Sequence, residues 1–190
     1  MLPKITNCSW ADLATVSSLK YRAARSLEAP DGRLFHSVAA VQCALSCIEL
    51  MGEISEPNVD LLEVLSTSNQ IDPGEAILLA LTAADPNGYF LTGDKRALKA
   101  VSQLDIAPSF AGRMIIVEQI LWKCLQVKGH GWLLENVCPF KSIDKTISII
   151  LGSRCDADAM HVCQGFSSYV SQVVQLHNPS LLVEYGPYEL

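Results

Sequence analysis

Carboxylates stand where predicted secondary-structure elements begin, and such positions suit two kinds of chemistry. Asp72 precedes a proline and Glu75 follows three residues later, which is the spacing of a helix capping box. Asp94 follows Gly93 at the end of a predicted strand, where an aspartate can cap the next helix. Carboxylate oxygens also bind hard cations. Residue type and spacing alone leave both interpretations open.

Cysteine and histidine are the next residue types that could ligate a metal or act as nucleophiles. Cys155, His161 and Cys163 lie close in sequence with Cys138 further back, but no CxxC pair occurs, which disfavours a structural zinc site. His36 has no partner in a recognisable motif, so no catalytic dyad is predicted. The seven cysteines are odd in number, and several fall on apolar stripes of predicted helices. We interpret them as buried, reduced thiols.

Basic side chains form the third group with possible chemistry. They lie on predicted helices that could flank one cleft and hold phosphate groups: Lys20, Arg22, Arg25, Lys95, Arg96 and Lys99. Helix faces are commonly basic for solvation alone, and the formal net charge of −6 opposes a phosphate backbone. Any contact with nucleic acid is therefore expected from a local basic patch.

Composition bounds the class of protein. The 190 residues suit one domain with an appendage, and 49% hydrophobic against 18% charged residues excludes disorder. No apolar run reaches the roughly 20 residues needed to cross a bilayer, and the N-terminus lacks the pattern of a secretory signal. We expect a soluble, cytoplasmic protein without a membrane partner.

Hydrophobic periodicity predicts the elements that must position these side chains. Helices are expected over 19–27, 34–48, 58–65, 72–84, 95–104 and 119–127. Strands are expected over 13–18, 89–92 and 113–118. Strands that alternate with helices are typical of a parallel sheet, so the predicted fold class is α/β.

The character of the sequence changes after Lys128. Gly129, Gly131 and Pro139 punctuate a connector. Apolar residues then mark a helix through Ile143, Ile147 and Ile150 and a longer one from Met160 to Val173. We predict an α/β domain over 1–128, a helical extension over 129–180 packed on the sheet domain, and a flexible tail over 181–190.

Part of the chain resembles a known family. The run Asp72-Pro-Gly-Glu-Ala-Ile-Leu-Leu-Ala-Leu, followed after a turn by Tyr-Phe-Leu-Thr-Gly-Asp94-Lys-Arg, is similar to the second half of a PIN domain, the fold of many toxin and RNA-processing endonucleases. The run from Met114 to Leu121 resembles the family's last strand and the following helix. The resemblance covers about 11–127, is specific over 72–101, and implies a parallel sheet with helices on both faces.

The resemblance also implies a metal site. In the family, three or four carboxylates at the carboxyl ends of neighbouring strands hold Mg²⁺ or Mn²⁺ ions that activate water. Glu75 matches the acid of the family's Gly-Glu-Ala, Asp94 matches the acid after the fourth strand, and Glu118 is a third possible ligand. The first-strand aspartate has no counterpart, and basic residues replace another expected acid within 20–22. The chain thus resembles an N-terminally truncated PIN domain.

Two functions follow from this resemblance. The first is a Mg²⁺- or Mn²⁺-dependent endoribonuclease in which Glu75 and Asp94 are catalytic, with RNA contacted by four basic residues, Lys20, Arg22, Lys95 and Arg96. The second is a catalytically inactive PIN-like binding module or truncated relative, whose partner is RNA, another protein or a second copy of the chain. The number of carboxylate ligands at one end of the sheet distinguishes the two, and we expect Glu75 and Asp94 to lie within about 10 Å of each other there.

Overall fold

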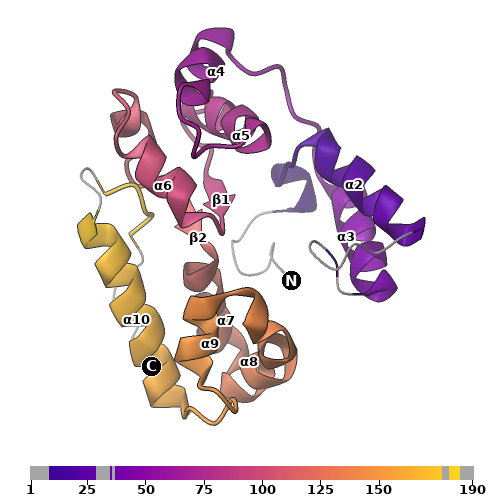
Figure 1. The fold of residues 1–190 in the computed structure, drawn as a ribbon, viewed down its shortest axis with the longest axis vertical. Helices are drawn as coiled ribbons and strands as arrows, with labels where there is room; N and C mark the ends of the chain where they lie inside the picture. Colours follow the sequence, from indigo (N-terminus) through magenta and orange to yellow (C-terminus); the bar gives the residue numbers. More distant parts are fainter. Residues whose placement is uncertain (1–8, 29–34, 36, 177–179, 185–190) are drawn as a thin grey trace. The chain divides into compact units, whose positions relative to one another are not determined.

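The computed structural model describes residues 9–28, 35, 37–176 and 180–184. In these residues the chain forms nine α-helices, three short 3₁₀ helices and one parallel sheet of two strands (Figure 1). The contacts divide the chain into two compact units, residues 1–88 and 89–190, which are described separately. The α/β class is confirmed at this coarse level. His36 and Cys8 lie outside the described residues.

The first unit is helical. Its helices are α2 (Ser17–Glu28), α3 (Val38–Leu50), α4 (Val59–Ser66) and α5 (Pro73–Ala84), preceded by the 3₁₀ helix η1 (Trp10–Asp12). Helix α2 packs on α3 and α4 packs on α5. Fully buried apolar side chains, among them Ala23, Val41, Leu65 and Leu79, fill this unit and account for the apolar spacing seen in the sequence.

The predicted strand over 13–18 is wrong. Ala14 forms one isolated parallel bridge with Gly52, and the chain enters α2 at Ser17. The Gly52 amide donates to the Leu13 carbonyl at 2.8 Å. A β-carbon added to Gly52 would lie 2.5 Å from the Ala11 carbonyl oxygen, so glycine allows this close approach of two backbones. Two β-branched residues were a weak signal for a whole strand.

The start of α5 follows its sequence signature. Asp72 Oδ1 accepts from the Glu75 amide at 2.9 Å, and Glu75 Oε2 accepts from the Asp72 amide at 3.1 Å. Pro73 occupies the first helical position, where its missing amide proton costs nothing. The capping box predicted at Asp72 is confirmed.

The second unit contains the sheet. Strands β1 (Phe90–Thr92) and β2 (Met114–Ile116) are parallel and are joined through helix α6 (Lys95–Val101) and the 3₁₀ helix η2 (Ala107–Phe110). Phe90 pairs with Met114 and Thr92 with Ile116, and all four side chains are buried. Both strands are shorter than predicted. The helix expected over 95–104 ends at Val101.

Helix α7 (Val117–Lys128) begins directly after β2, earlier than predicted. The side-chain oxygen of Gln119 accepts from the Ile116 amide at 3.0 Å, so the chain turns into a helix at Val117. Glu118 therefore lies in the first turn of α7 and not at the end of a strand, which corrects the sequence prediction.

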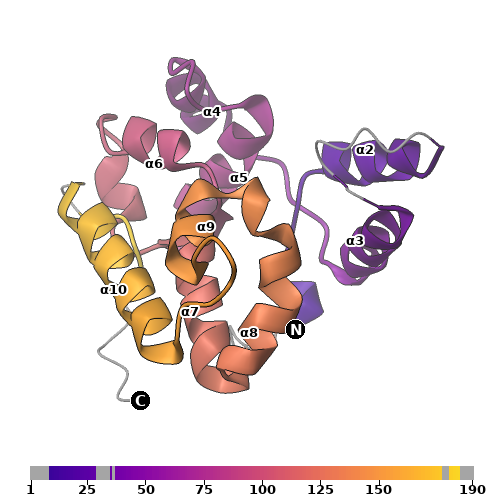
Figure 2. The ribbon, with the colours of Figure 1, turned by 60° about the horizontal axis from the view of Figure 1, so that its bottom comes forward.

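The two helices predicted after Lys128 are confirmed as α9 (Lys145–Leu151) and α10 (Ala159–Leu176). The segment predicted as a connector instead forms α8 (His130–Val137) and the 3₁₀ helix η3 (Cys138–Ile143), which also contains Ile143. Helix α10 packs on α7 and α9, and these segments lie side by side in Figures 1 and 2. The contacts thus place residues 129–176 with the strands in the unit that begins at Tyr89, whereas the sequence suggested a boundary at residue 128.

The segment 181–184 packs against the sheet, which corrects the first four residues of the flexible tail predicted over 181–190. Leu181 and Leu182 are 0% and 1% exposed, and Leu182 forms a parallel bridge with Met114. Gln119 Nε2 donates to the Val183 carbonyl at 2.9 Å. Residues 185–190 lie outside the described residues.

The interpretation of every cysteine as a reduced, buried thiol is also wrong. Cys138 and Cys155 form a disulfide with a Cα to Cα distance of 6.2 Å, within the usual range. Cys43 is an exposed thiol and Cys124 a buried one. In the described part of the chain, no helix is both long and apolar enough to cross a membrane.

Candidate functional site

Polar side chains gather where the two parallel strands of the second unit end. Residues 93–96 follow β1, Glu118 follows β2 by two positions, and residues 144–146 begin α9. A groove of about 430 Å³ is lined by residues 93–96 and 144–146. The carboxyl ends of parallel strands are where open α/β sheets hold their ligands. This groove is therefore the candidate site.

Lys95 joins two carboxylates at the groove. Its Nζ lies 2.7 Å from Glu118 Oε1 and 3.2 Å from Asp144 Oδ2. The Glu118 side chain is 0% exposed, and beyond the ammonium its carboxylate has no hydrogen-bond partner among the described residues. A buried carboxylate is costly without a counter-charge, so Lys95 is the group that makes Glu118 tolerable.

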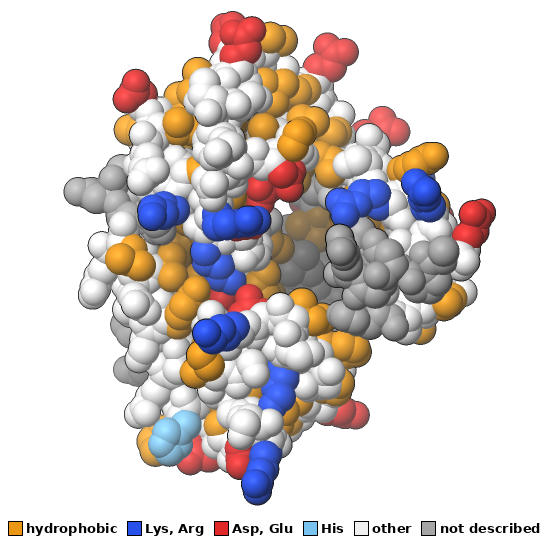
Figure 3. All heavy atoms as spheres, viewed as in Figure 1, with side chains coloured by type: hydrophobic (Ala, Val, Ile, Leu, Met, Phe, Trp, Pro, Cys, Tyr) orange, Lys and Arg blue, Asp and Glu red, His pale blue; other side chains and the backbone are white. Residues whose placement is uncertain are grey.

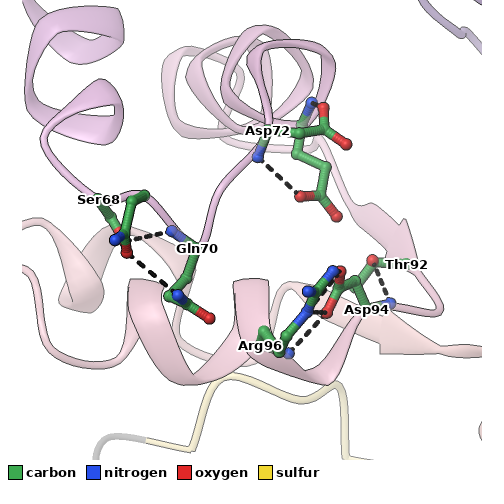
Figure 4. A network of polar contacts seen from close by, with 8 residues as sticks. Ser68, Gln70, Asp72, Thr92, Asp94 and Arg96 are labelled. Atoms are coloured by element: carbon green, nitrogen blue, oxygen red, sulfur yellow. Dashed lines mark hydrogen bonds and ion pairs between the residues drawn. The ribbon is translucent and has the colours of Figure 1, made fainter.

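Asp94 is held by its own helix. Its Oδ1 accepts from the Arg96 amide at 2.8 Å, and its Oδ2 lies 2.6 Å from Arg96 Nη2. The Asp94 amide donates to the Thr92 hydroxyl at 2.9 Å, which fixes the turn after β1. Figure 4 shows the Arg96 guanidinium lying along the Asp94 carboxylate. Asp94 is thus both the N-cap of α6 and one half of an ion pair.

The pKa values follow these contacts. The hydrogen bond from Arg96 is the main reason why the pKa of Asp94 lies below its ordinary value. Burial alone would lower the pKa of Lys95, but the hydrogen bond and charge of Glu118, with Asp144, raise it above the ordinary value. Burial alone would raise the pKa of Asp144, yet amide hydrogen bonds from 146–147 and the charge of Lys95 lower it. At neutral pH, Asp94 and Asp144 are therefore anions and Lys95 a cation.

Two of the three predicted ligands, Asp94 and Glu118, already contact basic side chains. Asp94 faces a guanidinium and Glu118 faces an ammonium, so each carboxylate already has a cationic partner. Across the described ranges, no group of three or more His, Cys, Asp or Glu side chains could hold a metal ion. Two carboxylates with bound cations are a poor set for Mg²⁺, which needs oxygen ligands in near-octahedral geometry.

The remaining predicted site residues belong to the first unit. Glu75 belongs to the capping box of α5, and Lys20 and Arg22 are exposed on α2. The expected proximity of Glu75 to Asp94, and of these basic residues to Lys95, stays a prediction because the two sets of residues belong to different compact units. On the face drawn in Figure 3, basic side chains lie in small groups with acidic side chains beside some of them.

Sequence reasoning missed Asp144. This residue caps α9 by accepting from the Thr146 and Ile147 amides at 2.8 and 3.1 Å. An aspartate before a short apolar run was a usable signal for the cap. Its pairing with Lys95, 49 residues away, had no local signal.

Helices α9 and α10 enclose a second groove of about 870 Å³ that includes Ile149, Ile150, His161 and Tyr169. At its rim, His161 Nδ1 lies 2.7 Å from Asp158 Oδ2, and both side chains are more than half exposed. Cys155 is committed to the disulfide, so the cysteine and histidine residues of this region do not assemble a zinc site among the described residues.

Comparison with family models, curated proteins and solved structures finds no match for the chain. The resemblance to a PIN domain therefore rests on the sequence alone, most specifically on residues 72–101.

Proposed function

We propose that this chain is a PIN-like binding module that takes an anionic ligand, single-stranded RNA in the first instance, without cleaving it. One observation carries this proposal: Lys95 Nζ lies 2.7 Å from Glu118 and 3.2 Å from Asp144. An ammonium lies where a metal-dependent nuclease would need a divalent cation between carboxylates. Both carboxylates therefore already share this ammonium as a cationic partner.

The groove offers cationic contacts beside this closed acidic cluster. Arg96 is 75% exposed at its side chain although it pairs with Asp94, and Lys145 also lines the groove. A guanidinium that pairs with a carboxylate at the surface can exchange part of that contact for a phosphate oxygen. The position at the carboxyl ends of parallel strands also supports a ligand here.

Fluorescence anisotropy with a labelled single-stranded RNA tests binding. We expect Arg96→Ala/Lys145→Ala to weaken binding by about tenfold or more. The slope of log affinity against log salt concentration should become shallower by the contribution of about two phosphate contacts. The matched control Lys99→Ala/Lys128→Ala removes the same charge from the same unit, outside the groove, and should change affinity much less. Equal weakening of RNA binding by both double variants would show that binding depends on overall charge and not on the groove.

Incubation of the same RNA with Mn²⁺ or Mg²⁺ tests the absence of cleavage. We expect intact RNA for the natural chain. Cleavage that disappears in Asp94→Asn would overturn the proposal and favour the metal-dependent endoribonuclease, with Asp94 as a ligand. Cleavage that persists in Asp94→Asn would point to a contaminating nuclease, and the assay would be repeated with Glu75→Gln and Glu118→Gln on repurified protein.

A further inference from the structure

The Cys138–Cys155 disulfide closes a loop that contains the whole of α9. The two cysteines are 17 residues apart in sequence: Cys138 begins η3, and α9 with its N-cap Asp144 lies between them. Both are partly exposed, so a small reductant can reach the bond. The disulfide therefore ties together the two segments that flank one short helix.

The same loop has a second, non-covalent fastening. Lys141 Nζ donates to the carbonyl oxygens of Gly152 and Ser153 at 2.7 and 2.6 Å. These contacts hold the segment after α9 near η3 without help from sulfur. Gly152 and Cys155 both have positive φ angles, 81° and 58°. Among the described residues, Cys155 is the one non-glycine residue with a positive φ angle. Such a backbone persists where surrounding contacts hold it.

Helix α9 forms part of both grooves. Its first residues, with Asp144, line the groove that contains Lys95, and Ile149 and Ile150 line the groove shared with α10. Loosening α9 would therefore release Asp144 from Lys95 and change both grooves at once. Seven residues are too few for a stable isolated helix, so α9 depends on the packing of its buried Ile147, Ile150 and Leu151 and on what holds its ends.

We propose that Cys138–Cys155 is a redox modification site whose reduction loosens α9 and opens the carboxylate cluster at Lys95. A thiolate of an external dithiol attacks one sulfur of the disulfide, which forms a mixed disulfide and releases the other cysteine as a thiolate. The second thiolate of the reductant then attacks the reductant's own sulfur in the mixed disulfide and releases the remaining cysteine. Two cysteine thiols form, and the dithiol becomes a disulfide, so two electrons and two protons are transferred. The contacts of Lys141 with Gly152 and Ser153 do not involve sulfur, so they can still join η3 to the segment after α9 when the bond is reduced. The modification concerns the proposed binding groove but does not depend on RNA binding.

Alkylation and mass spectrometry of the full chain test the bond. Acid-quenched protein, alkylated with and without prior dithiothreitol, should gain two labelled cysteines on reduction, mapped to Cys138 and Cys155. The variant Cys43→Ser/Cys47→Ser should show the same gain. If Cys138 and Cys155 are labelled without reductant in protein exposed to a disulfide oxidant, the proposal is overturned.

Hydrogen exchange tests the conformational consequence. Amides of 145–151 should exchange at least about tenfold faster after reduction, whereas those of 114–116 should not change. The variant Cys138→Ser/Cys155→Ser should show the same exchange rates as the reduced natural protein. If the variant does not fold, the comparison of oxidised with reduced natural protein decides the test. Unchanged exchange in 145–151 would overturn the proposal. Because these measurements contain no RNA, their failure is distinct from failure of the proposed function.

Discussion

The Nζ atom of Lys95 lies 2.7 Å from Oε1 of Glu118, and the Glu118 side chain is completely buried. Lys95 is the first residue of α6 and Glu118 the second of α7, the helices that follow β1 and β2. One ion pair thus ties together the two points at which the parallel strands turn into helices. Since breaking a buried pair leaves an uncompensated charge, this contact should matter for stability as well as for the site.

Replacing Lys95 should destabilise the second unit strongly. We expect Lys95→Met to lower the free energy of unfolding by about 3 kcal/mol, because the Glu118 carboxylate stays buried without its counter-charge. The double variant Lys95→Met/Glu118→Gln should recover much of that loss. Urea unfolding followed by circular dichroism measures both. As a control, Lys99→Met on the same helix should change stability by no more than about 0.5 kcal/mol. If Lys95→Met and Lys99→Met lowered the free energy of unfolding equally, the ion pair of Lys95 with Glu118 would not be what stabilises this unit.

Stability should fall in acid through two aspartates. The pKa values of Asp94 and Asp144 are lowered in the fold, so their contribution is present above the unfolded value of about 4 and is lost as pH falls through the folded values. We expect the slope of unfolding free energy against pH, below about pH 4, to be shallower in Asp94→Asn/Asp144→Asn. Urea titrations between pH 2.5 and 6, taken in steps of about half a unit, compare the two proteins. Parallel curves would contradict this assignment.

Substitutions in the capping box of α5 distinguish a structural role of Glu75 from a catalytic one. Asp72→Ala should cost about 1 kcal/mol, since it removes the side chain that accepts from the Glu75 amide. Glu75→Gln should cost much less, because glutamine also serves at this position of a capping box. Thermal unfolding measures the difference. A large loss of RNA binding in Glu75→Gln, with stability unchanged, would instead give Glu75 a role in the site.

Gly52 should resist substitution where Gly131 does not. A β-carbon on Gly52 would lie 2.5 Å from the Ala11 carbonyl oxygen, so Gly52→Ala should destabilise the chain by about 1–3 kcal/mol. Around Gly131 nothing lies within 4 Å of the added atom, and this residue is in a helix. Gly131→Ala should therefore be neutral or stabilise by up to about 1 kcal/mol. Urea unfolding of both variants checks the contrast.

The helices were predictable because their signals are local. Apolar spacing gave α3 and α4, and the sequence Asp72-Pro-Gly-Glu75 gave the start of α5. The strand over 13–18 failed because a strand requires partners, and Gly52 supplies a single bridge. The segment 181–184 looked like a loose tail because its burial depends on Met114, which lies 68 residues from Leu182 in sequence. Pairing over such distances has no periodicity to reveal it.

The candidate site was predictable in part for the same reason. Asp94 was found because it follows a strand and precedes a helix, and the structure adds that it caps α6. The partnership of Lys95 with Glu118 and Asp144 brings together three segments of the second unit and could not be found from spacing. The disulfide was missed because no sequence motif joins Cys138 to Cys155.

The bridge between Met114 and Leu182 has a consequence for association between chains. Strand β2 pairs with β1 on one side, and the Val183 amide donates to the Met114 carbonyl on the other at 2.9 Å. An exposed strand edge is a template on which foreign strands can add. Here the protein's own C-terminal segment covers that edge at Met114. A protein shortened before residue 180 would present the edge to its neighbours, so a tendency to aggregate should follow truncation even where the helices still fold.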